Sequence, residues 1–123
     1  MSSSDSRTAP VYLDTDWALS QIGDVESMNG MLQMLQESLA RDIPQVDALL
    51  QAGDVAAANR VLHALKGFIP IFCQQPLCEQ VVQVEALSKD PLSQAVGPAY
   101  RTLQPKLETL LAEVDWYLQA GVS

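Results

Sequence analysis

The residues best suited to chemistry lie in the segment HALKG at positions 63–67, which contains the chain's only histidine. In a helix, residues three and four positions apart lie on the same side, so His63, Lys66 and Gly67 would share one face. An imidazole beside an ammonium group suits the handling of phosphate. A glycine inside a helix costs about 1 kcal/mol relative to alanine, and close approach of another group to the backbone would account for its presence.

A histidine ring can carry a phosphoryl group on one nitrogen. To accept it, the ring must offer an unprotonated nitrogen while the other nitrogen keeps its proton, and a hydrogen-bond acceptor is needed to fix that tautomer. Glu85 is the candidate acceptor, because the helix that carries it is expected to run antiparallel to the histidine helix. Lys66 would supply positive charge to the phosphate oxygens, and Gly67 would leave space for the approaching group.

Other chemistries find less support in the sequence. There is no glycine-rich phosphate loop and no set of kinase motifs, so we predict a phosphoryl carrier without a cofactor that is not itself an enzyme. Cys73, Cys78 and the single histidine make an incomplete set of zinc ligands, and no metal site is expected. We expect both cysteines to be buried, reduced thiols.

The elements that position these residues are predicted to be helices, because apolar side chains recur at steps of three and four along most of the chain. A short first helix is expected over 14–22, ended by Gly23. A second helix would begin after Asp24 and end at Gly53, with Pro44 kinking it or restarting it.

The histidine helix is predicted to begin at Asp54 and to bury one apolar stripe, formed by Val55, Ala58, Leu62, Leu65, Ile69 and Phe72. His63 falls on a neighbouring stripe of mostly polar or small residues, which should meet solvent. Asn59 and Arg60 lie one turn before it and would either contact a docking partner or form ordinary helix surface. Pro70 should bend the helix just beyond the histidine.

Two further helices are predicted, over 76–88 and 98–119, the last with a kink at Pro105. The inward side chains of the first are expected to be Leu77, Val81 and Val84, with Leu87 as a further candidate. The predicted fold is all-α: an antiparallel four-helix bundle with an additional short N-terminal helix. We assign the domain to residues 13–120, and expect the polar, serine-rich residues 1–12 to form a disordered tail.

Charge and hydropathy exclude several classes of function. The 123 residues have a net charge of −8, which argues against nucleic acid or an anionic membrane as the main partner. No apolar run is long enough to cross a bilayer, and no apolar signal core is present at the N-terminus. We therefore expect a cytoplasmic protein, acting as a monomer.

At the segment 63–67 the chain resembles the histidine-containing phosphotransfer (Hpt) domain family. The pattern of that family is a histidine, any residue, a leucine, a lysine and a glycine, and the segment HALKG matches it at every position. Leu77 and Glu85 match the family's apolar and orienting positions on the next helix, and the resemblance extends over nearly the whole chain from about Asp14. It implies a bundle that accepts a phosphoryl group on His63 from a phosphoaspartate of a receiver domain. It would pass the group to another response-regulator aspartate, and a hybrid sensor histidine kinase is a further implied partner.

The chain also departs from the family pattern just after the histidine. Cys73 stands where a glycine is usual, and the larger residues from Phe68 to Ile71 replace small ones. Phe68 and Ile71 would add apolar contact surface beside the histidine for a docking receiver domain. The alternative is a non-catalytic helical module, or a degenerate Hpt scaffold, that binds receiver domains or other partners without phosphotransfer.

Overall fold

The computed structural model describes residues 10–121. This part of the chain forms the helices α1 (Thr15–Ile22), α2 (Val25–Gln51), α3 (Val55–Phe68), α4 (Leu77–Leu87) and α5 (Val96–Gly121), and a 3₁₀ turn, η2 (Ile69–Ile71), follows α3. It contains no strand, so the all-α prediction is confirmed. None of these helices combines the length and the apolar character that crossing a membrane requires.

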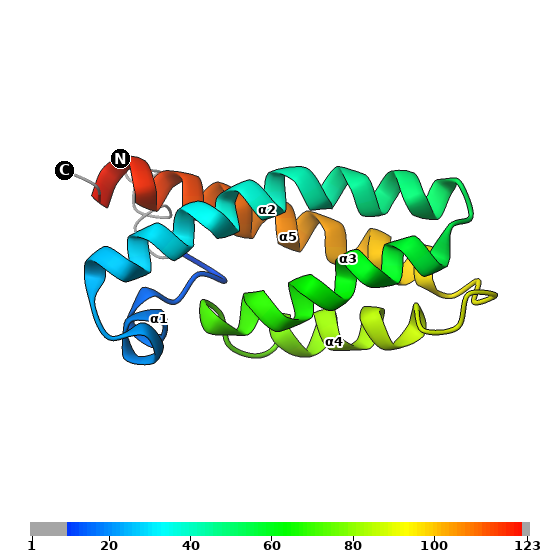
Figure 1. The fold of residues 1–123 in the computed structure, drawn as a ribbon, viewed down its shortest axis with the longest axis horizontal. Coiled ribbons are helices and arrows are strands. Elements are labelled where there is room, and N and C mark those ends of the chain that lie inside the picture. Colours follow the sequence, from blue (N-terminus) through cyan, green and yellow to red (C-terminus); the bar gives the residue numbers. More distant parts are fainter. Residues whose placement is uncertain (1–9, 122–123) are drawn as a thin grey trace.

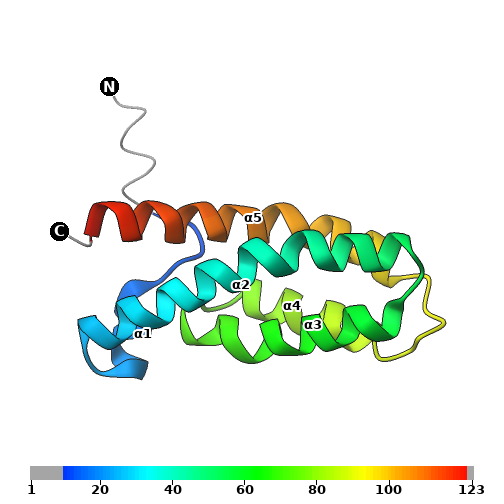
Figure 2. The same cartoon turned by 45° about the horizontal axis from the view of Figure 1, so that its top comes forward.

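The four longer helices form the bundle. Helix α2 packs against α3 and α5, and α4 closes the bundle by packing against the other sides of α3 and α5. Successive helices alternate in direction, so that α3 and α4 lie together on one side and α2 and α5 on the other (Figures 1 and 2). The short helix α1 packs against α2 and η2, at the end of the bundle where α3 ends.

Local signals set the starts of the first three helices. Asp14, Asp24 and Asp54 are their N-caps, and each carboxylate accepts a hydrogen bond from the backbone N–H three residues later. Gly23 and Gly53 adopt positive φ angles of 110° and 79° in the intervening turns, where a side chain would be strained. These short-range interactions explain why the predicted starts agree with the structure.

Helix α3 buries the predicted apolar stripe. The side chains of this stripe are all 9% exposed or less: Val55, Ala58, Leu62 and Leu65 on α3, Ile69 in η2, and Phe72 directly after it. Burial of this stripe against the rest of the bundle fixes the rotation of α3 about its own axis, because turning the helix would return those side chains to water. The polar stripe that carries His63 therefore faces outward.

Two details of the helices bear on the predictions. Of the two outcomes expected at Pro44, a kink or a restart, the restart is excluded, because α2 continues as one helix to Gln51. Packing against α3 and α5 along its length keeps the helix intact despite the missing N–H. Leu87, a candidate core residue, is instead 38% exposed. Helix α4 is rotated so that Glu85 and Ser88 take inward positions, which turns Leu87 toward solvent.

The segment before α1 is held against α5. The carboxylate of Glu113 accepts hydrogen bonds from the backbone N–H groups of Val11, Tyr12 and Leu13, at 2.6, 3.0 and 2.9 Å. Residues 1–9 of the expected disordered tail lie outside the described residues. Val11 and Tyr12, which were expected in the tail, are held with the folded domain, because one carboxylate on α5 satisfies consecutive backbone donors there.

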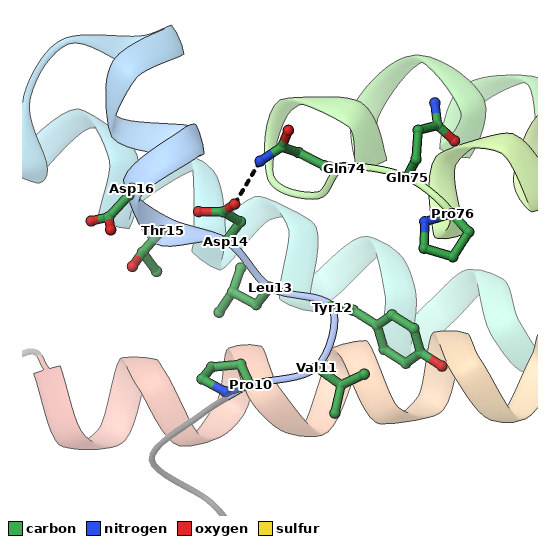
Figure 3. A pocket seen from close by; sticks show the side chains of 10 residues that line it. All are labelled: Pro10, Val11, Tyr12, Leu13, Asp14, Thr15, Asp16, Gln74, Gln75 and Pro76. Carbon is green, nitrogen blue, oxygen red and sulfur yellow. Dashed lines mark hydrogen bonds between the residues drawn. The ribbon is translucent and has the colours of Figure 1, made fainter.

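From α5 the same segment crosses to the connector between α3 and α4. Residues 10–16 and 74–76 together border a surface hollow of about 770 Å³ (Figure 3). The amide of Gln74 donates to the carboxylate of Asp14 at 2.7 Å across this hollow. The N-terminal segment is therefore attached to the connector between η2 and α4 as well as to α5.

Candidate functional site

His63 lies on the outer face of α3, beside α4. Its side chain is 68% exposed, as expected for a residue off the buried stripe. The ring is nevertheless anchored on one edge, because Nδ1 lies 3.3 Å from Oε2 of Glu85 on α4. An exposed imidazole with one nitrogen directed at a neighbouring helix leaves the other nitrogen to meet a partner.

The identity of the anchoring group determines the tautomer of the ring. A carboxylate can only accept hydrogen bonds, so the hydrogen between the two groups sits on Nδ1 of His63. In the neutral ring, Nε2 then carries the free lone pair. The expectation that an acidic residue of the next helix reaches back to the imidazole agrees with this geometry.

Glu85 also forms salt bridges with two lysines. Lys66 Nζ donates to Oε1 at 3.2 Å, and Lys89 Nζ lies 4.0 Å from the same oxygen. The two carboxylate oxygens are therefore divided, with Oε2 facing His63 and Oε1 facing the lysines. Sequence reasoning did not single out Lys89, which lies in the turn after α4, beyond the end of the predicted helix.

The charge state of Glu85 follows from competing effects. Burial, which leaves 2% of the side chain exposed, by itself raises the pKa of Glu85. Hydrogen bonds from Lys66 and His63, with the positive charges of Lys66 and Lys89, outweigh burial and hold the pKa below its ordinary value. Glu85 is therefore a carboxylate at neutral pH, which is the form that can accept from the imidazole.

Asn59 and Ser88 complete the surroundings of Glu85. Asn59 Nδ2 lies 2.8 Å from Ser88 Oγ, and 3.3 Å from both Oε2 and the backbone oxygen of Glu85. The Ser88 hydroxyl donates to that backbone oxygen at 2.6 Å. The structure thus turns Asn59 toward α4, whereas its neighbour Arg60 is exposed. Sequence analysis missed Ser88, for which no motif or spacing gave a signal.

Gly67 lies on the exposed surface one turn after His63. Apart from the backbone of its own helical turns and its two chain neighbours, a Cβ atom built there meets no atom within 4 Å, and the backbone does not adopt a positive φ angle. The fold of this chain therefore gives no steric reason for a glycine. The same is true of Gly30, on the outer face of α2.

The Hpt domain family model matches residues 30–115, about two thirds of the chain and the whole of α3 and α4. The chain belongs to the Hpt domain family. No curated protein and no solved structure matches it significantly. Hpt domains are phosphocarrier modules of two-component phosphorelays, and they interact with receiver domains and kinases. His63, Lys66, Gly67 and Glu85 all lie within the matched residues of this Hpt domain.

The apolar residues that follow the histidine in this Hpt domain are half-buried. Phe68 and Ile71 both pack against the core, and the Phe68 ring meets Phe72 edge-to-face with centroids 5.4 Å apart. Each side chain leaves only part of its surface for a partner. The α-helix ends at Phe68, so Pro70, where a bend was predicted, lies in the 3₁₀ turn η2.

The two cysteines lie at the junction of η2 and α4. Cys73 and Cys78 are 1% and 6% exposed, both are free thiols, and Cys78 Sγ donates to the Cys73 carbonyl at 3.1 Å. Burial raises the pKa of the Cys73 thiol well above its usual range. Between residues 10 and 121, no three His, Cys, Asp or Glu side chains are grouped as metal ligands. The expectation of buried thiols is confirmed.

Proposed function

We propose that this Hpt domain accepts a phosphoryl group on Nε2 of His63 from a phosphoaspartate of a receiver domain and passes it to another response-regulator aspartate. The observation that carries the proposal is an exposed imidazole whose Nδ1 lies against a buried, ionised carboxylate. This arrangement keeps Nε2 unprotonated and available to a partner. Family membership supports the same reaction class.

In the proposed step, the lone pair of His63 Nε2 attacks the phosphorus of the aspartyl phosphate. The N–P bond forms as the P–O bond to the aspartate breaks, and the electron pair of that bond stays on the released carboxylate. Nδ1 keeps its hydrogen, so the phosphorylated ring gains a positive charge that Glu85 stabilises. Attack by a second aspartate reverses these changes and returns His63 to its neutral form.

Lys66 is proposed to bind the phosphoryl oxygens. It lies one helical turn from His63, is 28% exposed, and contacts Glu85 through one oxygen only. An ammonium group has three donors on a flexible stem, so Lys66 can keep Glu85 as one partner and direct another hydrogen toward the phosphate. Gly67 would leave the approach to Nε2 open for the partner's backbone.

The test is phosphoryl transfer from a phosphorylated receiver domain of the same organism. The parent protein is expected to acquire an acid-labile, alkali-stable label, whereas His63→Gln, with unchanged circular dichroism, should acquire none. Equal labelling of the two proteins would rule out His63 as the acceptor.

The alternative function, a helical module that binds partners through Phe68 and Ile71 without phosphotransfer, is less well supported because both side chains pack partly against the core. It requires partner binding to persist in His63→Gln while the parent takes up no label. The monomeric state, the cytoplasmic location and the lack of a cofactor stay predictions.

A further inference from the structure

A partly buried polar cluster lies behind the His63–Glu85 pair and has no part in the proposed transfer step. It consists of Asn59 on α3 and Ser88 at the end of α4, joined by the 2.8 Å hydrogen bond from Asn59 Nδ2 to Ser88 Oγ. Ser88 is 1% exposed, and its own hydroxyl donates to the Glu85 backbone oxygen. The cluster therefore links the helix that carries the histidine to the helix that carries its acceptor.

Asn59 approaches the same carboxylate oxygen as the histidine does. Oε2 of Glu85 lies 3.3 Å from both His63 Nδ1 and Asn59 Nδ2, whereas Oε1 faces Lys66 and Lys89. The torsion that rotates a carboxylate is broad, so the partners of its two oxygens determine its orientation. Without Asn59, two cations on one side would compete with a single imidazole N–H on the other.

The orientation of the Asn59 amide is itself determined. Its three nearest polar neighbours are the Glu85 carboxylate, the Glu85 carbonyl and the Ser88 hydroxyl, and the first two can only accept. A flipped amide would place its oxygen against a buried negative charge. The NH₂ group of Asn59 is therefore directed at Glu85, and the Ser88 hydroxyl holds it there.

We propose that Asn59 is a positioning residue that acts on His63 through Glu85 and selects which ring nitrogen takes the phosphoryl group. By keeping Oε2 in place, Asn59 keeps the hydrogen of the imidazole on Nδ1 and leaves Nε2 as the nucleophile. Ser88 supports this by holding the amide. The inference rests on the proposed function for its chemical consequence, but its effect on the tautomer exists in the unphosphorylated protein.

The first measurement is the tautomer of His63, from ¹⁵N NMR at a pH where the ring is neutral. The second is the nitrogen that becomes phosphorylated by phosphoramidate, a small donor whose P–N bond breaks with release of ammonia. In the parent, we expect the hydrogen on Nδ1 and the phosphoryl group on Nε2. Asn59→Ala should raise the fraction of the other tautomer and of Nδ1-phosphohistidine about three- to tenfold, as expected for the loss of one hydrogen bond.

Ser88→Ala keeps the Asn59 amide. It should raise the fraction of the other tautomer and of Nδ1-phosphohistidine as well, but by a smaller factor than Asn59→Ala. Arg60→Ala, an exposed neighbour of Asn59 on α3, is the matched control and should change neither ratio. If Asn59→Ala does not fold, Ser88→Ala decides the matter, and unchanged ratios in the folded variant overturn the proposal.

The two proposals fail in different ways. A parent protein that takes no label on His63 from either phosphoramidate or a receiver domain contradicts the proposed function, and the tautomer measurement still tests the role of Asn59. A parent labelled on Nε2, with Asn59→Ala giving the same tautomer and the same labelled nitrogen, contradicts the positioning role alone.

Discussion

At the scale of single residues, Glu85 is the side chain on which the site depends most. It is almost fully buried, which by itself raises its pKa, yet it stays ionised because Lys66, His63 and Lys89 lower the pKa by more. Removing one side of such a pair is costly, because the other side keeps a charge or a donor that has lost its counterpart.

Glu85→Gln is expected to lower the free energy of unfolding by about 1–3 kcal/mol at pH 7, since it removes a carboxylate that accepts charged hydrogen bonds. The pKa of Glu85 is lowered in the folded protein. Its ionised form therefore adds stability that is fully present above about pH 4.5, the ordinary glutamate value, and is lost as the pH falls through the lowered value. In urea unfolding, the difference in stability between parent and variant should therefore shrink as the pH is lowered below about 4.5. A difference that stays constant from pH 7 to pH 3 would contradict the assignment.

Gly67→Ala is expected to separate stability from transfer. The added methyl group meets open space, so the variant should be more stable by about 0.5–1 kcal/mol in thermal or urea unfolding. The same methyl group would lie where a partner approaches His63, and the rate of phosphoryl transfer from a receiver domain should fall about tenfold or more. Gly30→Ala on α2 is the matched control and should gain stability without losing rate. Unchanged transfer in Gly67→Ala would show that the glycine does not provide clearance.

At the scale of elements, α1 and the segment before it secure the end of the histidine helix. The indole of Trp17 donates to the Pro70 carbonyl at 2.9 Å, and the Asp14 backbone N–H donates to the Phe72 carbonyl at 2.9 Å. Both acceptors lie in or directly after η2, where the α-helical hydrogen bonds have ended. The short N-terminal helix thus supplies donors that the end of α3 needs.

Trp17→Phe keeps an aromatic side chain and removes the indole donor. It is expected to lower the free energy of unfolding by about 1 kcal/mol, and to accelerate amide exchange in residues 71–73 more than in the middle of α3. Trp116→Phe, at a position on α5 that is 37% exposed, serves as the control. Uniform acceleration across the whole bundle would mean that Trp17 acts on global stability alone.

At the scale of the whole molecule, the charges are separated between the two sides of the bundle. The net charge is −8, but residues 55–89 hold three basic residues, Arg60, Lys66 and Lys89, and only two acidic ones, of which Glu85 is buried. Helices α3 and α4 form one side of the bundle (Figure 1). A partner that carries a phosphoryl group would therefore be drawn toward the face that contains His63 and repelled elsewhere.

Arg60→Glu and Arg101→Glu change the net charge equally, and both arginines are exposed, on α3 and α5 respectively. Arg60→Glu should lower kcat/KM for transfer from a phosphorylated receiver domain about tenfold at low ionic strength, with the difference shrinking at about 0.5 M salt. Arg101→Glu should have little effect. Equal losses in the two variants would indicate that only net charge matters.

The predictions that succeeded depend on neighbours in the sequence. Asp14, Asp24 and Asp54 cap helices through atoms a few residues away, and the apolar stripe of α3 follows from helical geometry. The same geometry places His63 and Lys66 on one exposed face. Composition predicts a tail that includes Val11 and Tyr12. Local signals do not reveal that they are held in place, because the carboxylate that binds them, on Glu113, is about a hundred residues away along the chain.

The sequence by itself therefore determined the helices, the outward position of His63 and the choice of Glu85 as its candidate partner. Only the tertiary structure decided how α4 is rotated against α3. That rotation brings Glu85 within 3.3 Å of His63, turns Ser88 inward to meet Asn59 of α3, and leaves Leu87 exposed. The physical reason is that the rotation of a helix depends on how side chains from several helices pack together, and such long-range packing leaves no periodic signal in the sequence of one helix.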